Sequence, residues 1–215
     1  MAIIQSPTGV QQEVDLNSKA SRVTLYDASG IEIFGAPLGA FMAPVNIRQT
    51  AATVAGSTVW AMRNGTGRTI SIKRAKLIMG FDGTTVALTT PRYSLNRFTL
   101  ATPTTGTPIV PIKQRTSYAA STVADIRQVD TGLTVAGITF ETEALVLALP
   151  LQTIFGAPTT GYAAGPVANH DIIFDPSGKR SESFELAPNE GLAIRLSTAA
   201  VIGLSLTGFV SWEER

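Results

Sequence analysis

One side chain in this 215-residue sequence can act as an imidazole base: His170, which stands in Asn169-His170-Asp171. A Ser-His-Asp triad needs a histidine between its nucleophile and its carboxylate, and a two-histidine metal site needs a second one. Asp171 and Asp175 could join His170 around a metal ion if the loop folded back, but the spacing follows no ligand motif. We therefore interpret His170 as a loop residue ahead of a strand, and we predict no catalytic, cofactor-binding or metal-binding residues.

Glutamate pairs offer the other route to acid–base chemistry. Glu141/Glu143 and Glu182/Glu185 could serve a glycoside hydrolase if their carboxyl groups stood roughly 5–10 Å apart across a sugar. Sequence spacing does not define such a separation, so we expect these residues on solvated strand faces. An enzyme such as a capsule hydrolase is therefore a third hypothesis behind two non-enzymatic ones.

Two further observations narrow the chemistry. The chain has no cysteine, which excludes disulfides, thiolate zinc sites, iron–sulfur clusters and cysteine nucleophiles. The segment Asn64-Gly65-Thr66-Gly67 lacks the third glycine of a dinucleotide-binding loop and leads into a strand rather than a helix. We interpret this segment as a hairpin turn and predict no cofactor.

The charge balance argues against a nucleic-acid partner. Lys and Arg total 17 against 16 Asp and Glu, so the net charge of +1 provides no bulk field for a polyanion. The densest basic cluster comprises Arg63, Arg68, Lys73, Arg74 and Lys76. We interpret it as polar strand positions or as contacts with an acidic partner surface. Trp60, Tyr93 and Trp212 could stack on a sugar, but we expect them in the core.

The sequence predicts neither a secretory signal nor a membrane segment. The N-terminal segment MAIIQSPTGVQQEVDLN lacks the basic region and the apolar stretch of a secretory signal. The longest apolar run, residues 144–151, is far shorter than the roughly 18–20 residues that span a bilayer, and Pro150 interrupts it. We predict no membrane segment.

We expect strands to position these residues, because the chain is rich in threonine, contains 19 glycines and 12 prolines, and lacks long stretches of helix-forming Glu, Lys, Leu and Gln. Short candidate strands separated by turns predict a jelly-roll-like antiparallel β-sandwich. At the N-terminus, residues 22–26 and 31–33 flank the turn 27–30 and predict a β-hairpin. Residues 35–56 carry few charges, and we interpret them as a connector lying on another surface.

The central strands are predicted at residues 58–63 and 68–81. In the second, Ile70 and Ile72 share one parity, whereas Ala75, Leu77 and Met79 have the other. A one-residue slip of this kind predicts a β-bulge at Lys73-Arg74.

The remaining elements follow from alternation and turn residues. A strand is expected near residues 93–100, followed by a proline-containing edge or loop at 101–116. Ser121 predicts a cap for a short helical turn at 122–127. Further strands are expected near 133–140, 143–153, 171–174, 183–186, 192–196 and 202–212, the last two as a hairpin.

Three blocks give the sequence a familial likeness: NSKASRVTLYDASG, NGTGRTISIKRAKLIMGFDGT with RYSLNRFTLATPTTGT, and FELAPNEGLAIRLSTAAVIGLSLTGFVSWEER. Together they resemble small virion structural proteins of tailed bacteriophages. Within that group the chain is similar to β-sandwich proteins that act as capsid cement or decoration proteins, or that form head fibres. The resemblance implies a homo-oligomer, by analogy a trimer, that contacts the major capsid protein or other virion proteins.

These observations predict residues 1–50 as an extended N-terminal arm with a hairpin and a Gly/Ala/Pro connector, and residues 51–215 as the sandwich. The expected function is non-enzymatic: the protein binds the outer surface of the capsid and clamps neighbouring subunits, without nucleic acid or membrane. The alternative is a head-fibre, collar or tail adhesin that binds a host glycan through loop aromatics such as Tyr118, Phe155 or Tyr162.

Overall fold

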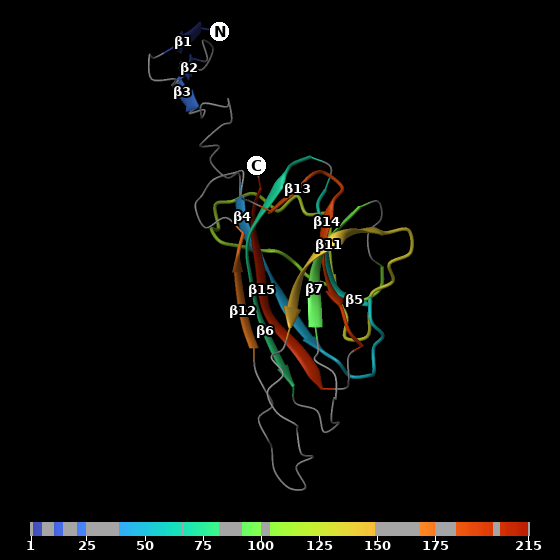
Figure 1. The fold of residues 1–215 in the computed structure, drawn as a ribbon. Coiled ribbons are helices and arrows are strands. Elements are labelled where there is room, and N and C mark those ends of the chain that lie inside the picture. The colour runs from blue at the N-terminus through green and yellow to red at the C-terminus, as the bar shows by residue number, and fades with distance from the viewer. Residues whose placement is uncertain are drawn as a thin grey trace.

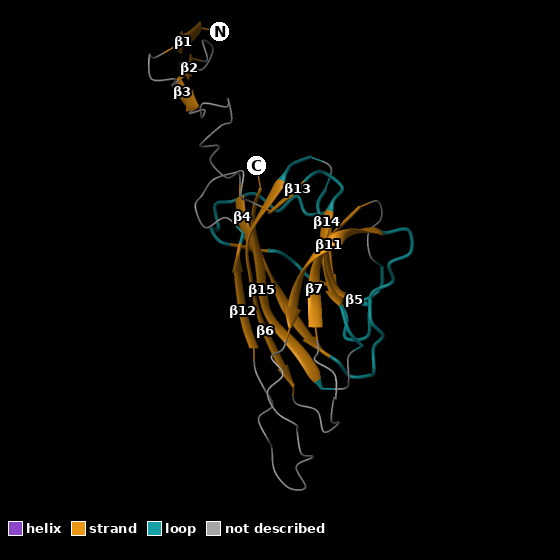
Figure 2. Cartoon of the chain, in the orientation of Figure 1, coloured by secondary structure: helices purple, strands orange, loops and turns teal. Residues whose placement is uncertain are grey.

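The computed structural model describes residues 2–5, 11–14, 21–24, 39–65, 67–81, 92–99, 104–148, 168–174, 184–199 and 203–214. Within these residues every regular element is a strand (Figures 1 and 2). The strands form two six-stranded antiparallel sheets and one three-stranded sheet. The predicted all-β class and the β-sandwich are confirmed.

The two large sheets are named here after their central strands. The β15 sheet has the order β12 (Ala168–Ile173), β6 (Ile70–Phe81), β15 (Leu204–Glu214), β4 (Gly39–Arg48) and β9 (Ile112–Lys113), and β13 (Phe184–Leu186) also pairs with β6. The β14 sheet has the order β11 (Thr139–Ala148), β7 (Arg92–Thr99), β14 (Gly191–Leu196), β5 (Thr58–Arg63), β10 (Asp125–Gln128) and β8 (Thr107–Pro108).

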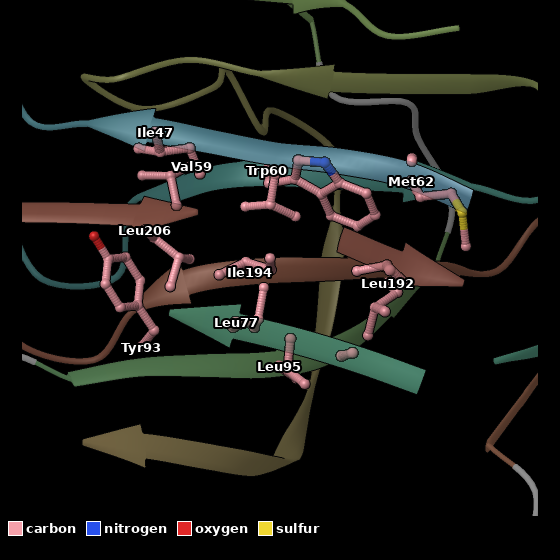
Figure 3. Packing of buried hydrophobic residues seen from close by; sticks show 14 of the residues in the cluster. Ile47, Val59, Trp60, Met62, Leu77, Tyr93, Leu95, Leu192, Ile194 and Leu206 are labelled. Carbon is pink, nitrogen blue, oxygen red and sulfur yellow. The ribbon is translucent and has the colours of Figure 1, made fainter. Parts of the chain in front are cut away.

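The core lies between these sheets. Val59, Trp60 and Met62 from β5 meet residues such as Leu77 from β6 and Leu206 from β15 (Figure 3). Trp60, Tyr93 and Trp212 are fully buried. Their predicted role as core aromatics is therefore confirmed.

The bulge predicted in β6 is present. Ile72 pairs with Trp212, and Arg74 pairs with Ser211, so Lys73 is the extra residue opposite two consecutive residues of β15. The buried side chains change parity at this point, from Ile70 and Ile72 to Ala75 and its successors.

The predicted connector, by contrast, contains a strand of the sandwich. Gly39–Arg48 pairs along its whole length with β15, so the sandwich begins at Gly39 among the described residues and not at residue 51. The segment has few charges because one of its faces lies in the core. Pro44 is tolerated because its backbone faces away from β15, where its carbonyl oxygen accepts a hydrogen bond from Trp60 Nε1 at 3.2 Å.

Two predicted hairpins are wrong because the strands concerned belong to different sheets. The turn after β5 carries the chain across the sandwich to β6, and the chain likewise crosses between β14 and β15. β14 lies between β5 and β7, and β15 lies between β4 and β6. Alternation identified these four strands, but their hydrogen-bond partners are distant in sequence.

Other predictions have mixed outcomes. The strands near 93–100, 171–174 and 183–186 are confirmed as β7, β12 and β13, and the proline-containing segment supplies the short edge strands β8 and β9. The helical turn at 122–127 is wrong, because Asp125–Gln128 pairs with β5 as a strand. The strands expected at 133–140 and 143–153 are represented by one strand, Thr139–Ala148.

The N-terminal strands form a sheet of their own, with β2 (Gln11–Val14) between β1 (Ala2–Gln5) and β3 (Ser21–Thr24). β3, which belongs to the first strand of the predicted hairpin, therefore pairs with β2, the strand that precedes it in the chain. The second half of that hairpin, with residues 25–38, lies outside the described residues. Among the residues that are described, no helix is long and apolar enough to span a membrane.

Candidate binding surface

His170 lies within β12 rather than in a loop ahead of a strand, and its Cα is paired with that of Leu77. Its Nε2 atom is buried and makes no hydrogen bond. The neighbouring Asp171 accepts two hydrogen bonds from Arg74, one of them from Nε at 2.6 Å, and this contact lowers the pKa of Asp171. Asp175 lies outside the described residues, and the described part of the chain contains no cluster of metal-ligating side chains.

The residues of the basic cluster contact different acceptors. Arg63 donates to Asn189 Oδ1 at 3.1 Å, and Arg68 lies 3.8 Å from Glu214. Lys73 and Glu213 form an ion pair at 3.3 Å, while Arg74 pairs with Asp171. Arg63, Lys73, Arg74 and Lys76 lie in strands β5 and β6, whereas Arg68 precedes β6.

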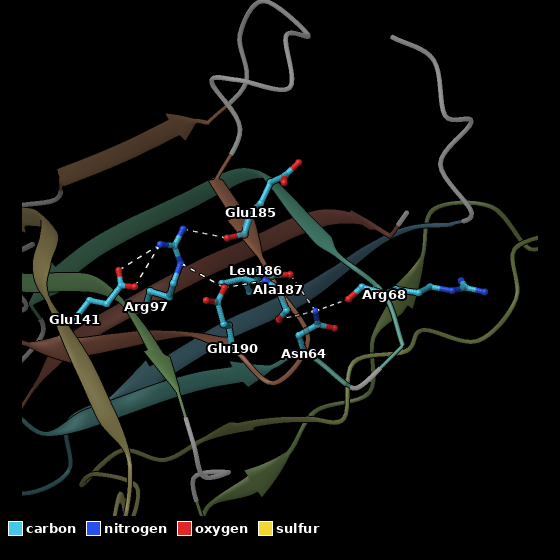
Figure 4. Close-up of polar contacts among 8 residues, drawn as sticks. All are labelled: Asn64, Arg68, Arg97, Glu141, Glu185, Leu186, Ala187 and Glu190. Carbon is cyan, nitrogen blue, oxygen red and sulfur yellow. Dashed lines mark hydrogen bonds and ion pairs between the residues drawn. The ribbon is translucent and has the colours of Figure 1, made fainter. Parts of the chain in front are cut away.

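Arg97 connects the two sheets along one side of the sandwich (Figure 4). From β7, its Nη2 donates to the backbone oxygen of Glu185 in β13 at 3.0 Å, and its Nη1 contacts Glu141 in β11 at 3.3 Å. Glu190 lies 3.8 Å from its Nε and also accepts a hydrogen bond from the Ala187 amide at 2.7 Å. Arg97 has the same parity along β7 as the core residues Tyr93 and Leu95. A cation at a core-facing position of a strand is the sequence signal that indicates a contact of this kind.

Next to this contact, the Asn64 side chain links the segment between β5 and β6 to the turn between β13 and β14. Its Nδ2 contacts the backbone oxygens of Arg68, Leu186 and Ala187 at 2.7–3.0 Å (Figure 4). Asn64 is fully buried. The segment that contains it therefore has a structural role, consistent with the absence of a nucleotide-binding pattern.

Glu214 is a fully buried carboxylate at the end of β15. It accepts hydrogen bonds from the Ser121 hydroxyl, from the Thr122 amide and hydroxyl at 3.0 Å, and from Trp212 Nε1 at 3.4 Å. Ser121, predicted as a helix cap, is thus a donor to a carboxylate 93 residues away. Four donors satisfy the carboxylate, which accounts for its burial.

Side chains from the β14 sheet cover the opposite side of the sandwich. Gln128 Oε1 accepts from the Asn46 amide at 3.0 Å, and Asp130 Oδ1 accepts from the Arg48 amide at 3.1 Å. β9 pairs with β4 only at Phe41 and Met42. These bonds satisfy the β4 edge beyond that point and protect it from pairing with another chain.

The outer faces of the two sheets differ. Residues 129–140 cover the outer face of the β14 sheet, where Leu133 and Phe140 pack with Ala61, Phe98 and Ala193. Arg195 reinforces this cover because its guanidinium lies 3.9 Å from the centre of the Phe140 ring and donates to the Gly56 oxygen at 2.8 Å.

The outer face of the β15 sheet has exposed side chains. Thr207 is exposed and lies between Asn46 of β4 and Ile78 of β6. Phe209 lies between Pro44 and Lys76 in the adjacent row. Ile78 is 36% exposed and Ile173 is 54% exposed. We call this surface, formed by the outward residues of β4, β15, β6 and β12, the open face.

The three-stranded sheet is formed by two antiparallel pairings. Ala2 pairs with Val14, and Gln12 pairs with Ile4 on one side and with Val23 on the other. Glu13 pairs in the same way with Ile3 and Arg22. A sheet of three four-residue strands contains too few residues for a core of its own.

The loop aromatics considered for sugar binding are not assembled among the described residues. Tyr118 is half-buried, with its ring centre 6.4 Å from that of the core residue Phe41. Phe155 and Tyr162 lie outside the described residues.

No family model, no curated protein and no solved structure matches the chain.

Proposed function

We propose that this chain is a non-enzymatic virion structural protein that binds the outer surface of a tailed-phage capsid and clamps neighbouring capsid subunits. The sequence blocks that resemble phage virion proteins are the origin of this proposal. The strand order supports a jelly-roll sandwich: without the shorter strands, the sheets have the orders β12-β6-β15-β4 and β11-β7-β14-β5. In each sheet a late strand lies between two early ones, as in a pair of linked Greek keys.

The N-terminal sheet is the observation that carries the proposal. It pairs within itself, and its three four-residue strands are too few for a core of their own. A neighbouring protein surface would cover this sheet and so attach the sandwich to the shell. An arm and a folded body that contact different subunits would clamp them, because linkage of two weak contacts raises the total affinity.

The use of charged side chains supports binding rather than catalysis. The carboxylates of Glu141, Asp171 and Glu214 accept hydrogen bonds or form ion pairs that join strands or loops. We further propose a closed homo-oligomer, by analogy a trimer, because closed symmetry lets one binding surface be used repeatedly around the shell.

Cryo-electron microscopy of particles of the phage that encodes this chain tests the proposal. We expect density for the sandwich at regular positions on the capsid surface, and its local symmetry would give the oligomeric state. Density confined to the neck or tail would overturn the cement function in favour of an adhesin or connector. Absence of the chain from the particle would overturn a virion role altogether.

A binding assay then tests the arm. Particles that lack the protein are mixed with the full-length chain or with a chain lacking residues 1–38, which retains β4. We expect the full-length chain to bind and the truncated chain to lose attachment while it keeps the thermal transition of the sandwich. Full occupancy by the truncated chain would contradict the role of the arm.

A further inference from the structure

The open face of the β15 sheet differs from the outer face of the β14 sheet, although both belong to one sandwich. The chain covers the second with its own residues 129–140. On the open face, Ile78 and Ile173 remain 36% and 54% exposed, and Phe209 is half-buried beside them. Exposed apolar side chains grouped on a sheet face are typical of an interaction site.

The register places these residues in three successive outward rows of the sheet. Ile78 pairs with Thr207 on one side and Asn169 on the other, and the next row holds Asp171, Lys76 and Phe209. Ile173 lies in the third row, opposite Arg74. Small or short side chains, such as Thr207 and Asn169, alternate with the larger ones. The face is therefore a broad sheet surface. A partner can contact it without entering a deep pocket.

The charge of the open face favours a partner of opposite sign. Its strands present the cations Arg48, Lys73, Arg74 and Lys76 and the carboxylates of Asp171 and Glu213. Arg74 pairs with Asp171 and Lys73 pairs with Glu213, while Asp130 lies at the margin, beside the Arg48 amide. The excess charge at the centre of the face is therefore the positive charge of Lys76.

From this pattern we infer that the open face docks on an acidic protein surface of the capsid shell, with Thr207 and Ile78 at the centre of the contact and Lys76 facing the acidic groups. The inference rests on the proposed function and adds a second contact to that of the N-terminal sheet. Complementary charge would orient the approach, and the apolar side chains would contribute the buried area.

Site-specific labelling tests this contact directly, because the chain has no cysteine. Thr207→Cys places a thiol on the open face, and Ala136→Cys places one on the exposed segment that covers the other sheet. On the full-length chain bound to particles, maleimide labelling of Thr207→Cys should slow by about tenfold or more, because the centre of a protein interface excludes solvent. Labelling of Ala136→Cys should change little.

A charge variant gives an independent measurement. Lys76→Gln should weaken binding to particles by about threefold to tenfold and reduce its dependence on salt, since a charged contact mainly affects association. Lys113→Gln is the matched control, because Lys113 is exposed but is paired opposite Phe41, which belongs to the core side of β4. Thermal unfolding of both variants establishes that they are folded.

The outcomes separate this inference from the proposed function. If the full-length chain binds particles but Thr207→Cys is labelled equally fast when free and bound, the open face is not the contact, and the proposed function stands. If Thr207→Cys is already protected in free protein that sediments as an oligomer, the occupant is a second copy and the inference is overturned. If the full-length chain does not bind, the proposed function itself fails.

Discussion

At the scale of single residues, the sandwich depends on positions where one side chain or its absence decides the geometry. Gly208 lies on the inward parity of β15 with a φ of 147°, a conformation that residues with a side chain rarely adopt. A Cβ atom there would lie 1.9 Å from the backbone oxygen of Lys76 on the neighbouring strand β6. The missing side chain therefore allows β15 and β6 to approach each other.

Gly208→Ala should destabilise the fold by about 3 kcal/mol, because both the clash and the strained φ have to be relieved. For a chain of this length, the melting temperature should fall by roughly 6–12 °C in calorimetry. Gly67→Ala is the control, since a Cβ atom at Gly67 meets nothing within 4 Å. A Gly208→Ala protein as stable as the wild type would show that β15 and β6 are further apart.

Glu214→Gln should lower the free energy of unfolding by about 2 kcal/mol, because the new amide group would oppose the donors of Ser121 and Thr122. Urea unfolding of the two proteins measures this difference. Glu213→Gln makes a matched control, since Glu213 is partly exposed and pairs with Lys73 near the surface, where the cost is below about 1 kcal/mol. Equal losses in the two variants would contradict the role of the buried carboxylate.

At the scale of elements, the bulge in β6 reconciles two stretches of opposite parity. Ile70 and Ile72 precede the bulge, Ala75 and Leu77 follow it, and all four side chains are buried on the same face. Lys73 is the inserted residue, so both stretches keep their hydrophobic face toward the core. The effect of a one-residue deletion on the stability of the fold should therefore depend on its position in this strand.

Deletion of Lys73 should yield a folded protein with a loss of only about 1–2 kcal/mol, since a regular ladder with unchanged faces can replace the bulge. Deletion of Lys76 should prevent folding, because it turns Leu77 and Met79 away from the core or, if the bulge closes instead, turns the Arg74 side chain into the core. Circular dichroism and the cooperativity of thermal unfolding distinguish the two outcomes. If both deletions unfold the chain, the bulge is itself required for the twist of the sheet.

At the scale of the whole molecule, the sandwich and the N-terminal sheet have different requirements. The sandwich closes its two sides with its own residues, Arg97 on one side and Gln128 with Asp130 on the other. The N-terminal sheet pairs within itself and has too few residues for a separate core. Its removal should leave the sandwich intact, whereas removal of β4 should not.

A chain lacking residues 1–38 should unfold cooperatively with a melting temperature close to that of the full chain. A chain lacking residues 1–50 should fail to fold, because β4 buries Phe41, Val45 and Ile47 in the core. Burial of each such side chain contributes about 1.5–3 kcal/mol, and the stability of a whole domain is only about 5–15 kcal/mol. Cooperative unfolding of the shorter chain would contradict the position of β4 within the sandwich.

The candidate binding surface could be predicted from the sequence only in part. The basic cluster near Lys76 was expected at polar strand positions or against an acidic partner, and the structure places Lys73, Arg74 and Lys76 along β6. Their pairing with Glu213 and Asp171, and the exposure of Ile78 and Ile173, depend on which strands lie beside β6. A single strand's sequence does not contain that information.

The same division holds for the fold. The sequence by itself determined the all-β class, most strand positions, and the change of buried parity in β6 with its bulge at Lys73, because alternation with a period of two is a local record of burial. Only the tertiary structure decided that Gly39–Arg48 is a strand of the sandwich, that β14 and β15 belong to different sheets, and that Ser121 binds Glu214. Strand partners and buried polar contacts join residues tens to more than a hundred positions apart, and they form only when the whole chain packs.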